Sequence, residues 1–210
     1  MATGQLSLYQ NALLLCGAES LKDLTENREP KRKLDLVWDS GRFVKGCLEQ
    51  ADWNFALRTQ RLTYEPSIQP DFGYRYAFVK PADWVRTAMI SGSEGFDPAL
   101  TRYSDEAGYW YSPLDTIYVQ FVSNDAEYGL DYSKWSESFT EWVEARLAKK
   151  VISRLTSSNT TFDKLDKLER RLYKTALKND VRNQPAVFMP RGSWANSRAG
   201  GRVYDPKDRR

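Results

Sequence analysis

The chain has 210 residues, enough for one domain or for one domain with a small inserted subdomain, and its 41% of hydrophobic residues excludes disorder of the whole chain. It contains no histidine. This excludes serine–histidine and cysteine–histidine nucleophiles and removes the commonest general base and the commonest metal ligand.

The net charge of +3 is unevenly distributed along the sequence. Residues 181–210 hold seven basic side chains against two acidic ones, whereas residues 1–180 hold 24 basic against 26 acidic side chains. A faintly acidic body is therefore followed by a basic segment. Charge segregation of this kind is typical of an arm that docks on something acidic.

The composition indicates a protein made in a cytoplasm. No segment approaches the ~20 uninterrupted apolar residues of a membrane helix, and residues 1–5 lack the basic and apolar regions of a signal peptide. Cys16 and Cys47 lie in apolar helical patterns. Both are expected to be reduced core residues, with a disulfide between them as the weaker alternative.

Apolar periodicity predicts two helices in the first part of the chain. Residues 6–16 place apolar side chains on a broad face, and Gly17 is a natural C-terminal stop. A second helix is predicted from Pro30 to about residue 51. Gly41 and Gly46 are the weak points of this predicted helix.

Residues 54–122 have the composition of β-structure. β-branched and aromatic residues gather in five short segments, and proline and glycine separate them as turns. The predicted strands are 56–64, 74–79, 85–90, 108–111 and 116–122. Five short strands in fewer than about 70 residues favour a small antiparallel sheet or barrel.

Helical periodicity returns after Trp135. Ser136 is a suitable N-cap, and apolar residues then recur three or four positions apart as far as Leu155. After a polar break at 157–160, a further helix is predicted, with one apolar stripe beside a charged face over residues 163–171.

The predicted fold is α+β: a four-helix bundle body with a small antiparallel β subdomain inserted between helices 2 and 3, followed by an extended C-terminal arm. The segments are the N-terminal helices of the bundle at 1–53, the inserted β-rich subdomain at 54–122, the C-terminal helices at 123–180 and the extended basic arm at 181–210.

Motifs for catalysis are sparse in this sequence. There is no GxxxxGK[ST], and no GxGxxG lies between a predicted strand and a predicted helix. The nearest carboxylate pairs for a magnesium site are Asp35 with Asp39 and Asp105 with Glu106, and a solvated helix face and a turn explain them more simply. The sequence therefore predicts no enzyme and no catalytic, cofactor or metal site.

Several blocks, in this order, resemble the head–tail adaptor family of tailed bacteriophages, also called tail tubular protein A. The resemblance covers nearly the whole body and ends near residue 180. The blocks are ALLLCGAESL at 12–21 with LTEN at 24–27, LEQADWNFA at 48–56, YRYAF at 74–78 with KPADWVR at 80–86, and IYV at 117–119 leading into the helix at 135–155 that contains ARLA at 145–148.

The resemblance implies a structural protein of the virion at the head–tail junction, assembled in the host cytoplasm. It implies a ring of twelve copies beneath the portal that joins the capsid to the next tail component, a nozzle or tail tube protein, and lets DNA pass. A lumen that does not grip phosphates must avoid dense lysine and arginine, so a neutral to acidic lumen is expected.

The basic arm is the predicted interface with the portal and with neighbouring subunits. Related adaptors send a C-terminal arm along the portal, and aromatic residues in an exposed tail favour an arm that orders on a partner. The candidate interface residues are Phe188, Arg191, Trp194, Arg198, Arg202 and Tyr204.

Two alternatives remain at this point. The first is a nucleic-acid-binding protein that acts through the basic C-terminal tail, because arginine, glycine and aromatic residues interleave there. The second, weaker one is a hydrolase or nuclease with a carboxylate metal site at Asp35 and Asp39.

Overall fold

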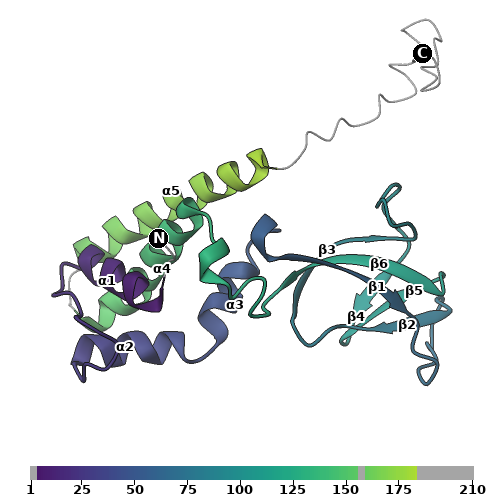
Figure 1. Cartoon of the computed structure of the whole chain (residues 1–210), viewed down its shortest axis with the longest axis horizontal. Coiled ribbons are helices and arrows are strands. Elements are labelled where there is room, and N and C mark those ends of the chain that lie inside the picture. The colour runs from purple at the N-terminus through teal and green to yellow at the C-terminus, as the bar shows by residue number, and fades with distance from the viewer. Residues whose placement is uncertain (1–3, 156–158, 184–210) are drawn as a thin grey trace, which may run out of the picture.

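The computed structural model describes residues 4–155 and 159–183, which form five α-helices and six β-strands. Figure 1 shows the helices gathered at one end of the molecule and the strands at the other. The helices are α1 (Gln5–Leu15), α2 (Glu29–Trp38), α3 (Arg42–Leu48), α4 (Glu137–Leu155) and α5 (Asn159–Arg182). The strands are β1 (Leu57–Thr63), β2 (Tyr76–Val79), β3 (Trp84–Ser91), β4 (Ser104–Glu106), β5 (Tyr109–Ser112) and β6 (Thr116–Ser123).

Helix α4 is the central element of the helical part. It packs against α1, α2 and α5, and its buried side chains recur at helical spacing. Ser136 accepts a hydrogen bond from the Phe139 N–H at 3.4 Å, so the predicted N-cap is confirmed. The fully or almost fully buried side chains of α4 are Phe139, Trp142, Val143, Ala145, Leu147, Ala148, Val151 and Ile152.

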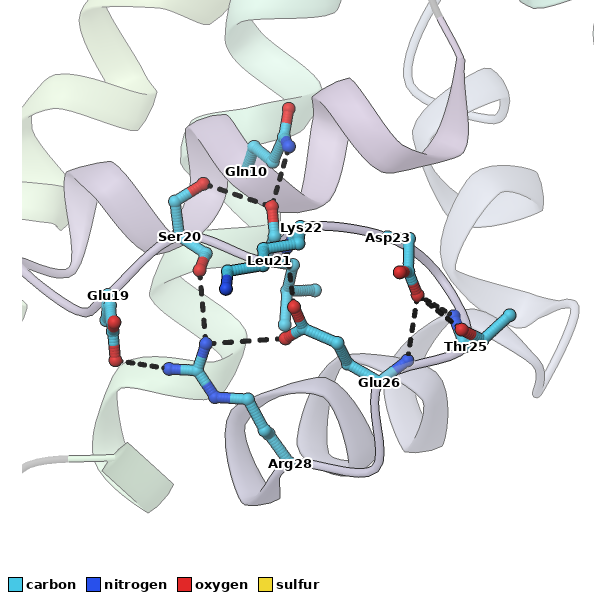
Figure 2. Close-up of polar contacts among 9 residues, drawn as sticks. All are labelled: Gln10, Glu19, Ser20, Leu21, Lys22, Asp23, Thr25, Glu26 and Arg28. Carbon is cyan, nitrogen blue, oxygen red and sulfur yellow. Dashed lines mark hydrogen bonds and ion pairs between the residues drawn. The ribbon is translucent and has the colours of Figure 1, made fainter.

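The loop between α1 and α2 is held by its own polar side chains (Figure 2). The Arg28 guanidinium donates to Glu19 at 2.5 Å and to Glu26 at 3.3 Å. Asp23 accepts from the Thr25 N–H at 2.7 Å. Gln10 of α1 donates to the Leu21 carbonyl at 2.7 Å and ties the loop to the helix that precedes it. The loop therefore has a defined shape although most of its residues are exposed.

The predicted second helix is broken in two. Gly41 has a φ of +65°, a left-handed conformation that ends α2 and precedes α3. The prediction of one helix from Pro30 to about residue 51 is therefore wrong. The break turns α3 away from the axis of α2, and Phe43, Val44 and Cys47 of α3 become part of the same core.

The strands form two antiparallel three-stranded sheets within the described residues, in the orders β1–β6–β3 and β2–β5–β4. β6 is the central strand of the first sheet, and it pairs along its length with both β1 and β3. Alternate residues of β6 point into a core of their own, as expected for a strand with one buried face. This core consists of Phe78, Ile90, Trp110, Ile117, Val119 and Phe121.

A buried lysine joins the two sheets. Lys80 lies with its ammonium 3.7 Å from the centre of the Trp84 ring, and its side chain is only 7% exposed. It forms an ion pair with Asp105, which also accepts hydrogen bonds from Thr87 at 2.9 Å and from Trp110 at 3.1 Å. A charge at this depth is stable because its partner is held by two further donors.

The predicted fold class is wrong. The described residues form five helices and two sheets, with three helices before the strands in the sequence and two after them. This is not a four-helix bundle body with a small inserted subdomain. The fifth helix arises because the break at Gly41 divides the predicted second helix into α2 and α3. β4 consists of Ser, Asp and Glu, and Asp and Glu are depleted in β-strands, so its sequence does not predict a strand. It pairs with β5 and becomes the third strand of the second sheet.

The left-handed Gly41 gives a direct test of the helix break. In Gly41→Ala, the new Cβ opposes the positive φ, so we expect the free energy of unfolding to fall by about 1 kcal/mol. Gly73→Ala is the matched control, because Gly73 also faces open space but lacks a positive φ. Urea unfolding of both variants measures the difference. A stabilised Gly41→Ala would instead indicate a continuous helix.

Glu144 provides a pH test of the α1–α4 packing. Burial raises the pKa of this carboxyl to about 7; the hydrogen bond from Asn11 opposes the shift, and Glu137 and Glu141 add to it. Because the folded-state pKa lies above the unfolded value, the folded protein binds more protons, and stability is lost as the pH rises towards and through about 7.

We therefore expect Glu144→Gln to equal the wild type near pH 4 and to exceed it by about 2 kcal/mol at pH 8. Urea unfolding across this pH range measures the gap between the two proteins. Parallel pH profiles would show that Glu144 is not buried against α1.

Candidate interaction surface

Helix α5 carries a row of basic side chains on its outer side. In an α-helix, residues three, four and seven apart share a face, and six basic residues of α5 follow this spacing over about 27 Å of helix. All six are exposed, and none forms an ion pair within residues 4–155 and 159–183. This α5 basic face consists of Lys164, Lys167, Arg171, Lys174, Lys178 and Arg182.

The acidic residues of α5 mostly point inward and are already paired. Lys149 of α4 bonds Asp166 at 2.5 Å and Glu169 at 3.0 Å. Asp180 accepts hydrogen bonds from the Asn54 N–H, and Asn54 donates in turn to the Asp180 carbonyl at 2.7 Å. Burial raises the pKa of Asp180. The positive charge of the outer face is therefore opposed on α5 only by the exposed Asp163.

A groove of about 420 Å³ runs between α4 and α5 and ends beside α3. Its floor includes Trp142, whose ring lies 5.3 Å from the Arg146 guanidinium. Tyr173 closes one end by donating to the Gln50 carbonyl at 3.1 Å. The residues that line this α4–α5 groove are Gln50, Trp142, Arg146, Lys149, Lys150, Phe162, Glu169, Arg170 and Tyr173.

The groove and the α5 basic face form one surface. Arg170 lines the groove and also lines a shallow hollow of about 460 Å³ that lies over the basic face. Phe162 is 39% exposed, and Val181 near the end of α5 is 61% exposed. The exposed arginine and aromatic groups have the chemistry of a protein interface, and the lysines beside them add positive charge that complements an acidic partner.

Three of the four carboxylates in the sequence-predicted pairs accept hydrogen bonds from protein donors. Asp35 accepts from Tyr9 at 3.2 Å and from Lys31 at 2.6 Å, and Asp105 belongs to the Lys80 cluster. Glu106 accepts from its neighbour Ser104 at 2.6 Å.

The described residues contain neither a cluster of metal-ligating side chains nor a helix that could span a membrane. No group of three or more Cys, Asp or Glu side chains within them is placed to hold a metal ion. None of their helices has the length and apolar character needed to cross a membrane.

The predicted interface residues of the arm lie outside the described residues. These are Phe188, Arg191, Trp194, Arg198, Arg202 and Tyr204. The α4–α5 groove was missed by sequence reasoning, which recognised only a charged face at 163–171. The α5 basic face did have a signal in the sequence, because basic residues continue at three- and four-residue intervals to Arg182.

Neither protein-family models nor curated proteins match this sequence. The resemblance to the adaptor family therefore stays a prediction from the motifs themselves.

The α5 basic face is expected to be dispensable for folding. Replacing Lys167, Lys174 and Lys178 together by Gln removes like charges that lie three to four residues apart, so stability should be unchanged or rise by a few tenths of a kcal/mol. Lys149→Gln, which breaks two ion pairs, should instead lower the free energy of unfolding by about 1 kcal/mol.

Chemical denaturation of the two variants checks this contrast. A large loss of stability in the triple variant would mean that the face is structural and not free to bind a partner.

Proposed function

We propose that this protein is a structural head–tail adaptor of a tailed bacteriophage. In this role, copies of the chain form a ring beneath the portal, connect the capsid to the next tail component and let DNA pass. The subunit makes contacts and catalyses no reaction. The ordered family-like blocks in the sequence are the starting point of the proposal.

One observation of the structure supports it most. The α5 basic face is exposed, lacks ion pairs within the described residues and leads directly into the basic segment 181–210. Basic residues therefore continue from α5 into the sequence that follows it. Such a surface fits attachment to a large acidic partner better than a small-molecule site.

The family-like blocks also have structural roles that suit a rigid subunit. In the block at 80–86, Asp83 accepts hydrogen bonds from Arg58 at 2.8 Å and Ser123 at 2.5 Å, which joins β1, β3 and β6 where the sheet meets the helices. In the block at 48–56, Trp53 is fully buried between the helices. A subunit that transmits load between a capsid and a tail needs such fixed joints.

Exposed apolar residues on other helices are available for contacts between subunits. Leu14 of α1 is 73% exposed and Leu36 of α2 is 68% exposed. Leu36 lines a mainly apolar hollow together with Asp39. In a ring, each copy contacts its two neighbours through two different, complementary surfaces. Helices α1 and α2 are separate from α5 in the sequence, so their exposed leucines can provide a surface other than the α5 basic face.

A second candidate function is nucleic-acid binding through the basic tail. The α5 basic face favours it to the extent that it lengthens the positive surface beyond residues 181–210. Binding of that kind would depend steeply on salt, because each phosphate contact releases counterions.

Assembly on a portal tests the adaptor function. Purified chain mixed with assembled portal of the same phage should add a ring of density at one end of the portal in electron micrographs. Trp194→Ala should weaken this capture about 30-fold, the cost of a typical aromatic anchor. A portal from an unrelated phage serves as the control. Bare portals at micromolar concentrations of the chain would contradict the proposal.

A further inference from the structure

We propose that the α4–α5 groove and the α5 basic face bind an acidic segment of a partner protein, which inserts an apolar side chain into the groove. This inference adds to the proposed function the chemistry of the surface that contacts the partner. It rests on the proposed function only for the partner's location in the virion. It assigns the contact to the body of the subunit in addition to the arm.

The groove has the composition that such a segment requires. The exposed aromatic part of its floor is Tyr173, and Phe162 stands at its edge with 39% of its surface exposed. Trp142 also lines the groove, but only 1% of its surface is exposed. Arg146 and Lys150 stand around this floor. An aromatic floor with a cationic rim can bury one apolar side chain and pair with the carboxylates on either side of it.

The positive charges that line the groove exceed the negative charges within it. Glu169 is its acidic lining residue, and Lys149 already neutralises it at 3.0 Å. Arg170 pairs with Asp166 at 2.9 Å, yet its side chain is 74% exposed. Lys150 has no ion pair within residues 4–155 and 159–183. Excess positive charge therefore remains on the rim and continues along α5.

The protein's own arm is a poor occupant of this surface. Residues 184–210 carry six basic side chains against two acidic ones. Like charges across an interface cost free energy, so the basic arm is repelled from the basic groove and the α5 face. Because the arm and the α5 basic face are both positively charged, both favour an acidic partner.

The geometry favours a polypeptide over nucleic acid. Trp142 is 1% exposed and carries the Arg146 guanidinium on its ring, so it offers no open face on which a base could stack. Phe162 in the groove and Val181 beside the basic row are exposed apolar residues. Phosphate contacts gain nothing from this apolar surface, whereas a protein segment can cover it.

Three fluorescent probes test the inference on the full-length protein at about 150 mM salt. The first is a 12-residue peptide of Asp and Glu with one central Phe, the second has Ala in place of this Phe, and the third is a 20-base-pair DNA duplex. We expect the Phe peptide to bind at least ten times more tightly than the Ala peptide, and more tightly than the duplex.

Three variants locate the site. Lys150→Glu and Phe162→Ser should each weaken binding of the Phe peptide at least fivefold, whereas Arg61→Glu, the same change of charge at an exposed position of β1, should leave it within twofold. Phe162→Ser acts without changing charge, so it separates insertion into the groove from general attraction. Circular dichroism confirms that each variant is folded.

Tighter binding of the duplex, equal binding of the two peptides, or a failure of all three probes to bind would each overturn the inference. The portal experiment separates this from the proposed function. Rings that form normally on the portal with Lys150→Glu and Phe162→Ser would leave the adaptor function standing while removing the groove from it.

Discussion

The packing of Trp53 among the helices, just before the chain enters β1, is the contact on which the rest of the structure depends. Its side chain is fully buried, and its indole N–H donates to the Cys47 carbonyl at 3.1 Å. The Trp53 ring lies 4.7 Å from Phe139 and 5.6 Å from Trp142, both on α4. Each such pair stabilises by about 1 kcal/mol beyond the burial of area, and the cluster fixes where the chain leaves α3 for β1.

The same cluster fixes the position of α5. Tyr173 lies 5.1 Å from Trp142, and Asp180 bonds Asn54, the residue that follows Trp53. Helix α5 is thus attached at two places to the junction from which β1 begins. Trp142 belongs to the core through Trp53 and to the α4–α5 groove through Arg146. The groove and the basic face are therefore held at the point where the chain enters β1 of the first sheet.

Parts of this arrangement could be predicted from sequence because they depend on local periodicity. The spacing of apolar residues after Ser136 predicted α4, and the interval of three or four predicted α5. Five of the six described strands were expected from aromatic and β-branched residues. In each case the chain's own neighbours dictate the structure.

The remaining features depend on contacts between distant residues. The burial of Lys80 depends on the approach of Asp105 and two tryptophans, which its neighbours in the sequence do not indicate. β4 forms because β5 supplies a partner, and Gly41 breaks a helix that its flanking residues would continue. The groove could not be predicted, since it requires the α4–α5 packing to be known. The arm residues stay candidates on sequence grounds alone.

The most direct test of the central claim is native-state hydrogen exchange in Trp53→Leu. If Trp53 fixes the junction between α3 and β1, amides in the second half of α5 and in the first residues of β1 should lose protection together, by a similar factor, because both are held at one junction. Loss of protection confined to α3 and the turn at 49–53, with α5 unchanged, would contradict the account.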